Sequence, residues 1–254
     1  MAMTPEKARL IKSTIVPTAF ITVFWVVRIF ENFTGIDLSM FGILPLQPEG
    51  LYGIICSPLL HADFSHLLAN SVPFFVLGSA LFFFYKEIAL RVLILSWLFT
   101  GIWVWCFARG GAYHIGASGV VYALASFHFF SGLIRREPRL MAFTLLVVFL
   151  YGSMVWGVFP DFFPTKNISW ESHLMGLLAG LILAFYYRTT GPQRPKYEWA
   201  DEDIDEADYP ADEPEPLIPE INNQVENESP DDTARKPDEI KINYIFKAGN
   251  RGNA

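Results

Sequence analysis

The chain has 254 residues, of which 52% are hydrophobic and 16% aromatic, proportions that exclude an ordinary soluble domain and are typical of a protein that crosses a membrane several times. The formal net charge is −7, but residues 1–195 hold 13 Lys and Arg against 9 Asp and Glu, while residues 196–254 hold 6 against 17. Two cysteines, Cys56 and Cys106, exclude a disulfide framework and are expected to be free, buried thiols.

Six apolar runs separated by charged residues predict membrane-spanning helices. Each run has about 15 to 20 residues, close to what a hydrocarbon core of roughly 30 Å requires of a helix that rises ~1.5 Å per residue. No small-residue cleavage site follows Phe30, so we expect the first run to remain as an anchor. The predicted spans are residues 15–30, 66–85, 88–107, 118–134, 140–159 and 173–187.

The segment between the first two spans, residues 31–65, is apolar but is interrupted by residues such as Gly42 and Pro45. Such a segment is too broken to cross a bilayer, and it suits a structure that lies half sunk in the membrane interface.

The distribution of Lys and Arg predicts the orientation of the bundle. With six spans both chain ends lie on one side, and that side collects 11 Lys and Arg, whereas Arg28, Arg109 and Lys166 remain on the other. Because cytoplasmic loops carry the excess of positive charge, the N- and C-termini are expected to be cytoplasmic.

The composition changes beyond Thr190 to Asp, Glu, Pro and Asn, with few hydrophobic residues to bury. This change predicts a disordered acidic tail, with one short apolar stretch at residues 240–246 that could order or bind a partner. The expected organisation is a cytoplasmic N-terminus (1–13), an all-α polytopic membrane domain of six helices (14–190) and the acidic cytoplasmic tail (191–254).

Three polar side chains on three spans are predicted to lie at one depth. Ser118 lies 17 residues from Arg135, His173 15 residues from Arg188 and Asn70 16 residues from Lys86. These separations correspond to about 25, 22 and 24 Å along a helix. Because polar groups are costly in hydrocarbon and usually face an interior cavity, each is a candidate functional residue. A serine and a histidine at one depth suggest a nucleophile and its base.

Helical spacing predicts which of these residues share one face of a helix. His66 and Asn70 share one face of the second span, and Ser118 and Tyr122 share one face of the fourth. Small residues at helical spacing allow the fourth and sixth spans to approach closely, which would bring His173 within hydrogen-bonding distance of Ser118. These small residues are Gly119 and Ala123 on the fourth span and Gly176 and Gly180 on the sixth.

Three spans thus carry an ordered set of polar and small residues, which consists of His61, His66, Asn70, Gly116, Ala117, Ser118, Gly119, Tyr122, His173, Gly176 and Gly180. Over residues 15–190 this set resembles the rhomboid intramembrane serine proteases. The resemblance implies a six-helix fold in which Ser118 attacks a substrate carbonyl and His173 acts as general base and then as general acid, without a third acidic residue.

The resemblance also implies roles for the neighbouring residues. His66, Asn70 and the backbone N–H of Ser118 would form the oxyanion hole, Gly116 would support it, and Tyr122 would pack against the His173 ring. Span five, with Trp156, would be the gate through which a substrate helix enters. Water would reach the site through an outward-facing cavity beneath loops 109–115 and 160–171.

The sequence departs from the pattern of this family at three places. Tyr52-Gly53 stands where many relatives carry Trp-Arg, and Phe82 stands where many carry Glu. Ser172 replaces a frequent Ala before His173, and its hydroxyl could compete for the imidazole. The first two departures concern loop anchoring and stability, whereas the catalytic set is intact.

The remaining polar and aromatic residues have simpler interpretations. His61 either supports the oxyanion hole or caps the second span, and both readings stay open. His114 is expected to be a loop residue and His128 an interhelical hydrogen-bonding partner, while Asp63, Asp161 and Glu171 are expected to be solvated loop charges. Residues 82–85 and 103–105 are expected to be lipid-facing or interfacial aromatic packing.

Other catalytic classes do not fit the spacing. Val120 occupies the last glycine position of an α/β-hydrolase elbow, and no His-Glu-x-x-His motif is present for a zinc protease. Haem ligation by His66, His128 or His173 would leave Ser118 and Asn70 unexplained. A catalytically silent relative that binds membrane helices remains the rival, although such relatives typically lose the serine or the histidine.

The expected function is therefore hydrolysis of peptide bonds in or near transmembrane segments, without cofactor or metal. The expected partners are single-pass membrane protein substrates and lipids, not nucleic acid, and the expected location is a bacterial plasma membrane.

Overall fold

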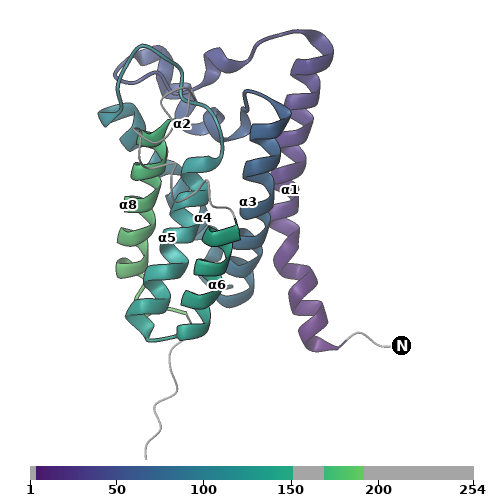
Figure 1. Ribbon diagram of the computed structural model, residues 1–254, viewed down its shortest axis with the longest axis vertical. Coiled ribbons are helices and arrows are strands. Elements are labelled where there is room, and N and C mark those ends of the chain that lie inside the picture. Colours follow the sequence, from purple (N-terminus) through teal and green to yellow (C-terminus); the bar gives the residue numbers. More distant parts are fainter. Residues whose placement is uncertain (1–3, 151–168, 192–254) are drawn as a thin grey trace, which may run out of the picture. The chain divides into compact units, whose positions relative to one another are not determined.

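The computed structural model describes residues 4–150 and 169–191, and in these residues it is a helical bundle without any strand (Figure 1). An isolated antiparallel bridge joins Ile43 to His114. The long helices are α1 (Pro5–Thr34), α3 (Phe64–Phe84), α4 (Ala89–Phe107), α5 (Ser118–Arg135), α6 (Pro138–Leu150) and α8 (Trp170–Tyr186). The all-α prediction is confirmed.

Helix α1 begins earlier and ends later than the predicted span, because local signals fix both of its ends. The Thr4 side chain accepts a hydrogen bond from the Lys7 amide, and Pro5 occupies the first turn, where its missing N–H costs nothing. At the other end Gly35 adopts a left-handed conformation with φ of 70° and donates its N–H to the Glu31 carbonyl.

Helix α3 begins after Asp63, whose carboxylate accepts the His66 amide at 2.7 Å. Asp63 is exposed, as predicted for a solvated charge, and its carboxylate has the additional role of capping the helix. This cap also excludes the reading in which His61 caps this helix.

Among the described residues, three helices are long and apolar enough to span a membrane, namely α1, α3 and α4, while α6 and α8 are shorter apolar helices. The count of six spans stays a prediction, because part of the fifth predicted span lies outside the described residues. The acidic tail beyond residue 191 lies outside them as well.

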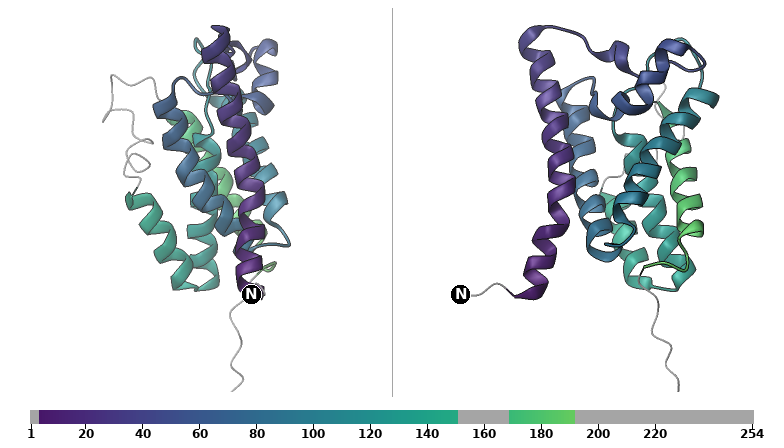
Figure 2. Two further views of the ribbon diagram at one scale, coloured as in Figure 1. Left: turned by 90° about the vertical axis from the view of Figure 1, so that its right-hand side faces the viewer. Right: turned by 180° about the vertical axis from the view of Figure 1, so that it is seen from behind.

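Short helices fill the connection from α1 to α3, which lies at the end of the bundle opposite to the first turn of α1 (Figures 1 and 2). Trp105 on α4 donates its indole N–H to the Gln47 carbonyl at 2.9 Å and ties this connection to the bundle. The short helices are η1 (Ser39–Phe41), η2 (Pro48–Tyr52), α2 (Gly53–Cys56) and η3 (Ser57–Leu59).

The most extensive helix contact is between α5 and α8, which lie side by side (Figure 1). A Cβ added at Gly176 would collide with the Gly119 carbonyl, and one added at Gly180 would collide with the Ala123 carbonyl. The Ser126 hydroxyl donates to the Leu177 carbonyl at 2.6 Å. Glycine thus permits direct backbone contact between the two helices.

Arg135 fastens the far end of this helix pair. Its Nη2 donates to the carbonyls of Tyr187 and Thr190 at 2.6 and 2.7 Å, and its Nε donates to the Ser131 hydroxyl at 2.8 Å. Tyr85 donates to the same hydroxyl at 3.0 Å and is 1% exposed. Tyr85 is therefore core packing, and the prediction of a lipid-facing or interfacial role is wrong for it.

Other interior positions refine the predictions. His128 is fully buried and bonds the Leu77 carbonyl at 3.0 Å, which confirms its interhelical role. Val104 is also buried within α4, so the run 103–105 does not simply face lipid. Cys56 and Cys106 are free, as predicted, but half-buried.

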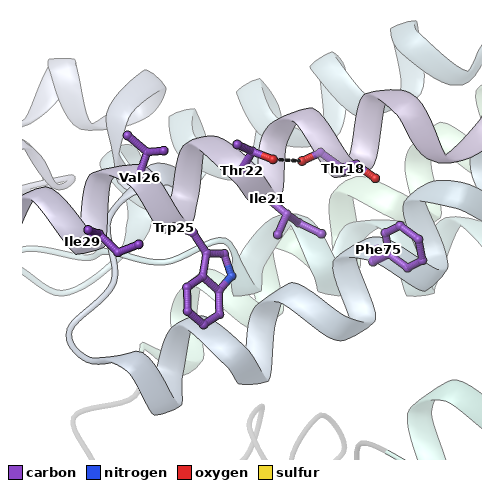
Figure 3. A pocket seen from close by; sticks show the side chains of 7 residues that line it. All are labelled: Thr18, Ile21, Thr22, Trp25, Val26, Ile29 and Phe75. Atoms are coloured by element: carbon purple, nitrogen blue, oxygen red, sulfur yellow. Dashed lines mark hydrogen bonds between the residues drawn. The ribbon is translucent and has the colours of Figure 1, made fainter.

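An open apolar groove of about 360 Å³ lies between helices α1 and α3 (Figure 3). Trp25 points from α1 toward α3 and donates its indole N–H to the Ser71 hydroxyl at 3.1 Å, while the Thr22 hydroxyl donates to the Thr18 carbonyl of its own helix. The groove contains no polar side chain of α3, and it is separate from the polar residues on α5 and α8.

Replacing Gly180 by Val tests the contact between α5 and α8. The added side chain collides with backbone atoms of α5, so we expect a loss of stability of about 3 kcal/mol, the upper end of ordinary overpacking. Thermal unfolding in detergent micelles measures it. Leu178→Phe adds volume at an exposed position of the same helix and should leave the midpoint unchanged; equal midpoints for both variants would contradict the described contact.

Replacing Arg135 by Met tests the hydrogen bonds at the far end. The carbonyls of Tyr187 and Thr190 lose their donor, and we expect a loss of about 3 kcal/mol, since hydrogen bonds to charged groups contribute ~1.5–3 kcal/mol each. The adjacent Arg136→Met is the matched control, because Arg136 is exposed and surface substitutions change stability by about 0.5 kcal/mol or less. Indistinguishable unfolding midpoints would refute the anchoring role.

Candidate active site

Ser118 and His173 face each other across the contact between α5 and α8. Ser118 is the first residue of α5, and His173 lies in the first turn of α8. The distance between Ser118 Oγ and His173 Nε2 is 2.9 Å. The glycines that let the helices touch place the imidazole at hydrogen-bonding distance from the hydroxyl, as the spacing predicts.

Tyr122 holds the histidine ring from one side. It lies one turn after Ser118, and its ring stacks on that of His173 with centroids 4.2 Å apart and an interplanar angle of 14°. Parallel stacking restricts rotation of the imidazole, so Nε2 stays directed at the Ser118 hydroxyl. A buried carboxylate is not needed for this orientation.

His66 and Asn70 converge on the turn that precedes Ser118. Gly116 has a φ of 113°, which favours glycine, and a Cβ there would lie 2.8 Å from the His66 ring and 3.7 Å from Asn70 Nδ2. Asn70 Nδ2 is buried and has no hydrogen-bond acceptor among the described residues. A buried unpaired donor is costly, so it is a candidate for binding a developing negative charge.

His61 supports this turn from behind. It is 2% exposed, lies 5.2 Å from the His66 ring, and accepts the Ala117 amide at its Nε2 over 3.5 Å. Burial, reinforced by the positive charge of His66, lowers the pKa of His61 to about 3. The neutral imidazole therefore has a lone pair for the Ala117 amide, and support of the oxyanion hole by His61 stays a prediction.

The backbone adds positive potential at the same place. Gly116 donates its N–H to the Ser57 carbonyl at 2.8 Å, and the first helical bond of α5 runs from Val121 to Ala117. The amides of residues 118–120 therefore have no partner within the helix. Together with the helix dipole they favour negative charge beside Ser118.

The loops above the site contain interactions that the sequence did not predict. Glu171 is 7% exposed and pairs with Arg109 at 2.7 Å, so the prediction of a solvated charge is wrong. Ser172 bonds the Ser169 hydroxyl at 2.7 Å, which turns it away from competition for the imidazole. Ser169 is the N-cap of α8, and a serine just before an apolar run is the signal that could have revealed it.

Several predicted features cannot be placed. Trp156, Asp161 and most of the loop 160–171 lie outside the described residues. Within the described part of the chain, no group of three His, Cys, Asp or Glu side chains could hold a metal ion.

Comparison with known proteins identifies the family of the chain. Residues 48–190 match the model of the Rhomboid domain. The chain is 32% identical over 180 residues to an uncharacterized protein of Mycobacterium tuberculosis, covering 69% of this chain and 74% of that protein.

The similarity to two relatives that are named as rhomboid proteases covers a smaller share of each chain. The putative rhomboid protease YdcA of Bacillus subtilis is 31% identical over 140 residues, covering 52% of this chain and 65% of that protein. The rhomboid protease GlpG of Pectobacterium atrosepticum is 33% identical over 147 residues, covering 53% of this chain and 49% of that protein. The helices, the domain match and these similarities together show that the chain is an integral membrane protein of the rhomboid family, whose members are intramembrane serine proteases.

Proposed function

We propose that this protein is a serine endopeptidase that hydrolyses peptide bonds in or near transmembrane segments, with Ser118 as nucleophile and His173 as general base and acid. The observation that carries the proposal is the 2.9 Å contact between Ser118 Oγ and His173 Nε2. A serine hydroxyl is a poor nucleophile until a positioned base accepts its proton, and this contact supplies that base.

In the proposed reaction His173 Nε2 takes the Ser118 proton as Oγ attacks the substrate carbonyl carbon. The resulting imidazolium gives this proton to the nitrogen of the leaving amine, and the peptide bond breaks to leave an acyl-enzyme. Water then attacks the ester while His173 again accepts and returns a proton, which releases the carboxylic acid and restores Ser118. Stacking on Tyr122 keeps the His173 ring oriented toward Ser118 during these steps.

The negative charge on the carbonyl oxygen would be stabilised by the donors around Gly116. Asn70 Nδ2 is buried and has no acceptor among the described residues. The Ser118 amide stands at the start of α5, where the first N–H groups have no partner within the helix. His66 borders the same space. Donors that are already oriented cost no reorganisation as charge develops, and this is why they accelerate acyl transfer.

The substrates in this proposal are single-pass membrane proteins, cut near the outer face. The asymmetry of 11 Lys and Arg against three supports cytoplasmic termini, and similarity to bacterial proteins supports a bacterial plasma membrane. The rival function, a catalytically silent adaptor that binds membrane helices, does not require the hydrogen bond between Ser118 and His173.

Substituting Ser118 or His173 by Ala tests the enzyme assignment. We expect the purified wild-type protein in liposomes to cleave a model transmembrane substrate, and each variant to lose all detectable cleavage, because each lacks one partner of the proton transfer. A fluorophosphonate probe should label the wild type and not Ser118→Ala. Cleavage at the wild-type rate by either variant would reject the assignment, and absence of both cleavage and labelling in the wild type would favour the adaptor.

Asn70→Ala tests the proposed oxyanion donor separately. Loss of one such donor typically reduces kcat by roughly 10²–10³-fold, and we expect that loss in the same cleavage assay with little change in KM. Ser71→Ala is the matched control, because Ser71 is a buried polar neighbour on α3 whose hydroxyl bonds Leu67 and Trp25 instead. Equal kcat values for the two variants would remove Asn70 from the proposed site.

A further inference from the structure

The loop before Ser118 and the start of α8 are joined by one side-chain hydrogen bond. His114 lies four residues before Ser118, and Ser169 lies four residues before His173. The distance between His114 Nδ1 and Ser169 Oγ is 2.5 Å. The same two chain segments also meet at the ion pair of Arg109 with Glu171 and at the contact between Ser118 and His173.

The backbone and ring of His114 are held on other sides as well. Its N–H donates to the Ile43 carbonyl at 2.8 Å, and its carbonyl accepts from Ile43 at 3.0 Å. Its Nε2 lies 3.2 Å from the Arg109 carbonyl. Arg109 in turn pairs with Glu171 in the first turn of α8. The imidazole is therefore a fixed support.

The protons of this network can be assigned from its acceptors. A carbonyl oxygen only accepts, so His114 Nε2 carries the proton that faces Arg109, and in the tautomer with its proton on Nε2 the other ring nitrogen, Nδ1, is an acceptor. The Ser169 hydroxyl therefore donates to His114 Nδ1. Its lone pairs remain for the Ser172 amide at 3.2 Å and the Ser172 hydroxyl at 2.7 Å.

We propose that His114 is a positioning residue that sets the place of His173 relative to Ser118, by orienting the hydroxyl of Ser169 that caps α8. The proposal rests on the proposed function for its catalytic consequence. When Ser169 donates to His114, its lone pairs point at the first turn of α8 and fix the backbone of Ser172, the neighbour of His173. The Ser172 carbonyl lies against Gly119, where a Cβ would come within 3.0 Å, so a shift of this turn changes the approach of the two helices at the reacting atoms.

Loss of this bond should affect catalysis rather than folding. The middle of α8 is held by Gly176 and Gly180 against α5, and its end by Arg135. Without His114 only the first turn can shift. Small misplacements of reacting groups reduce rate strongly, up to about 10²-fold for about 1 Å.

The experiment compares His114→Ala, His114→Asn and Ser169→Ala with Tyr113→Ala, a control at an exposed neighbouring position. We expect kcat to fall about 10- to 100-fold in the two variants His114→Ala and Ser169→Ala, with KM and the unfolding midpoint unchanged. Asn offers an acceptor near the place of Nδ1 and should restore most of kcat. The double variant should be no slower than either single one, since both remove the same interaction.

The rate of amide hydrogen exchange at residues 170–173 is a second measurement, which does not depend on catalytic activity. Exchange should be faster in His114→Ala than in the wild type or in Tyr113→Ala. Wild-type kcat together with unchanged exchange in His114→Ala would overturn the proposal. If the wild type neither cleaves nor reacts with a fluorophosphonate, the proposed function fails. Amide exchange then still tests the role of His114: faster exchange in His114→Ala supports positioning of α8, and unchanged exchange contradicts it.

Discussion

The direct backbone contact between α5 and α8 is the constraint on which the rest of the site depends. Where Gly176 and Gly180 meet the carbonyls of α5, the helices lie closer than side chains would allow. Only at that separation can a short imidazole on one helix reach a hydroxyl on the other. In a membrane no hydrophobic effect drives helices together, so small residues, interhelical bonds such as that of Ser126, and the anchoring by Arg135 must hold the pair.

Hydrogen bonds lower the cost of placing polar groups in an apolar bundle. His61 accepts from Ala117, Gly116 donates to Ser57, and His128, deeper in the bundle, bonds Leu77. Several buried side-chain atoms have no partner among the described residues, for example Thr100 Oγ1 and Trp170 Nε1. Asn70 Nδ2 is one, and it lies beside the turn that carries Ser118. Its desolvation is a cost in the resting protein that an oxyanion would offset.

The sequence predicts the helices well because hydropathy records which segments enter lipid and spacing records which residues share a face. Helix α5 begins at Ser118 as expected, and α4 ends at Phe107 as expected. The errors fall on the ends of α1 and on single charged or aromatic residues. Buried Glu171 forms an ion pair with Arg109, and buried Tyr85 donates a hydrogen bond to Ser131. Both partners are distant in sequence. Such pairings leave no periodic signal, and neither does the bridge between Ile43 and His114.

The position of Glu171 also shows why this carboxylate is not a third partner of the proposed pair. Glu171 is the acidic residue nearest to His173 in sequence, but it lies two residues away on the same helix. Residues two apart point in nearly opposite directions around a helix, so its carboxylate turns to Arg109 while the imidazole turns to Ser118. A carboxylate on the inner face would have to be desolvated beside α5, at a cost of several kcal/mol. Stacking on Tyr122 orients the ring without that cost.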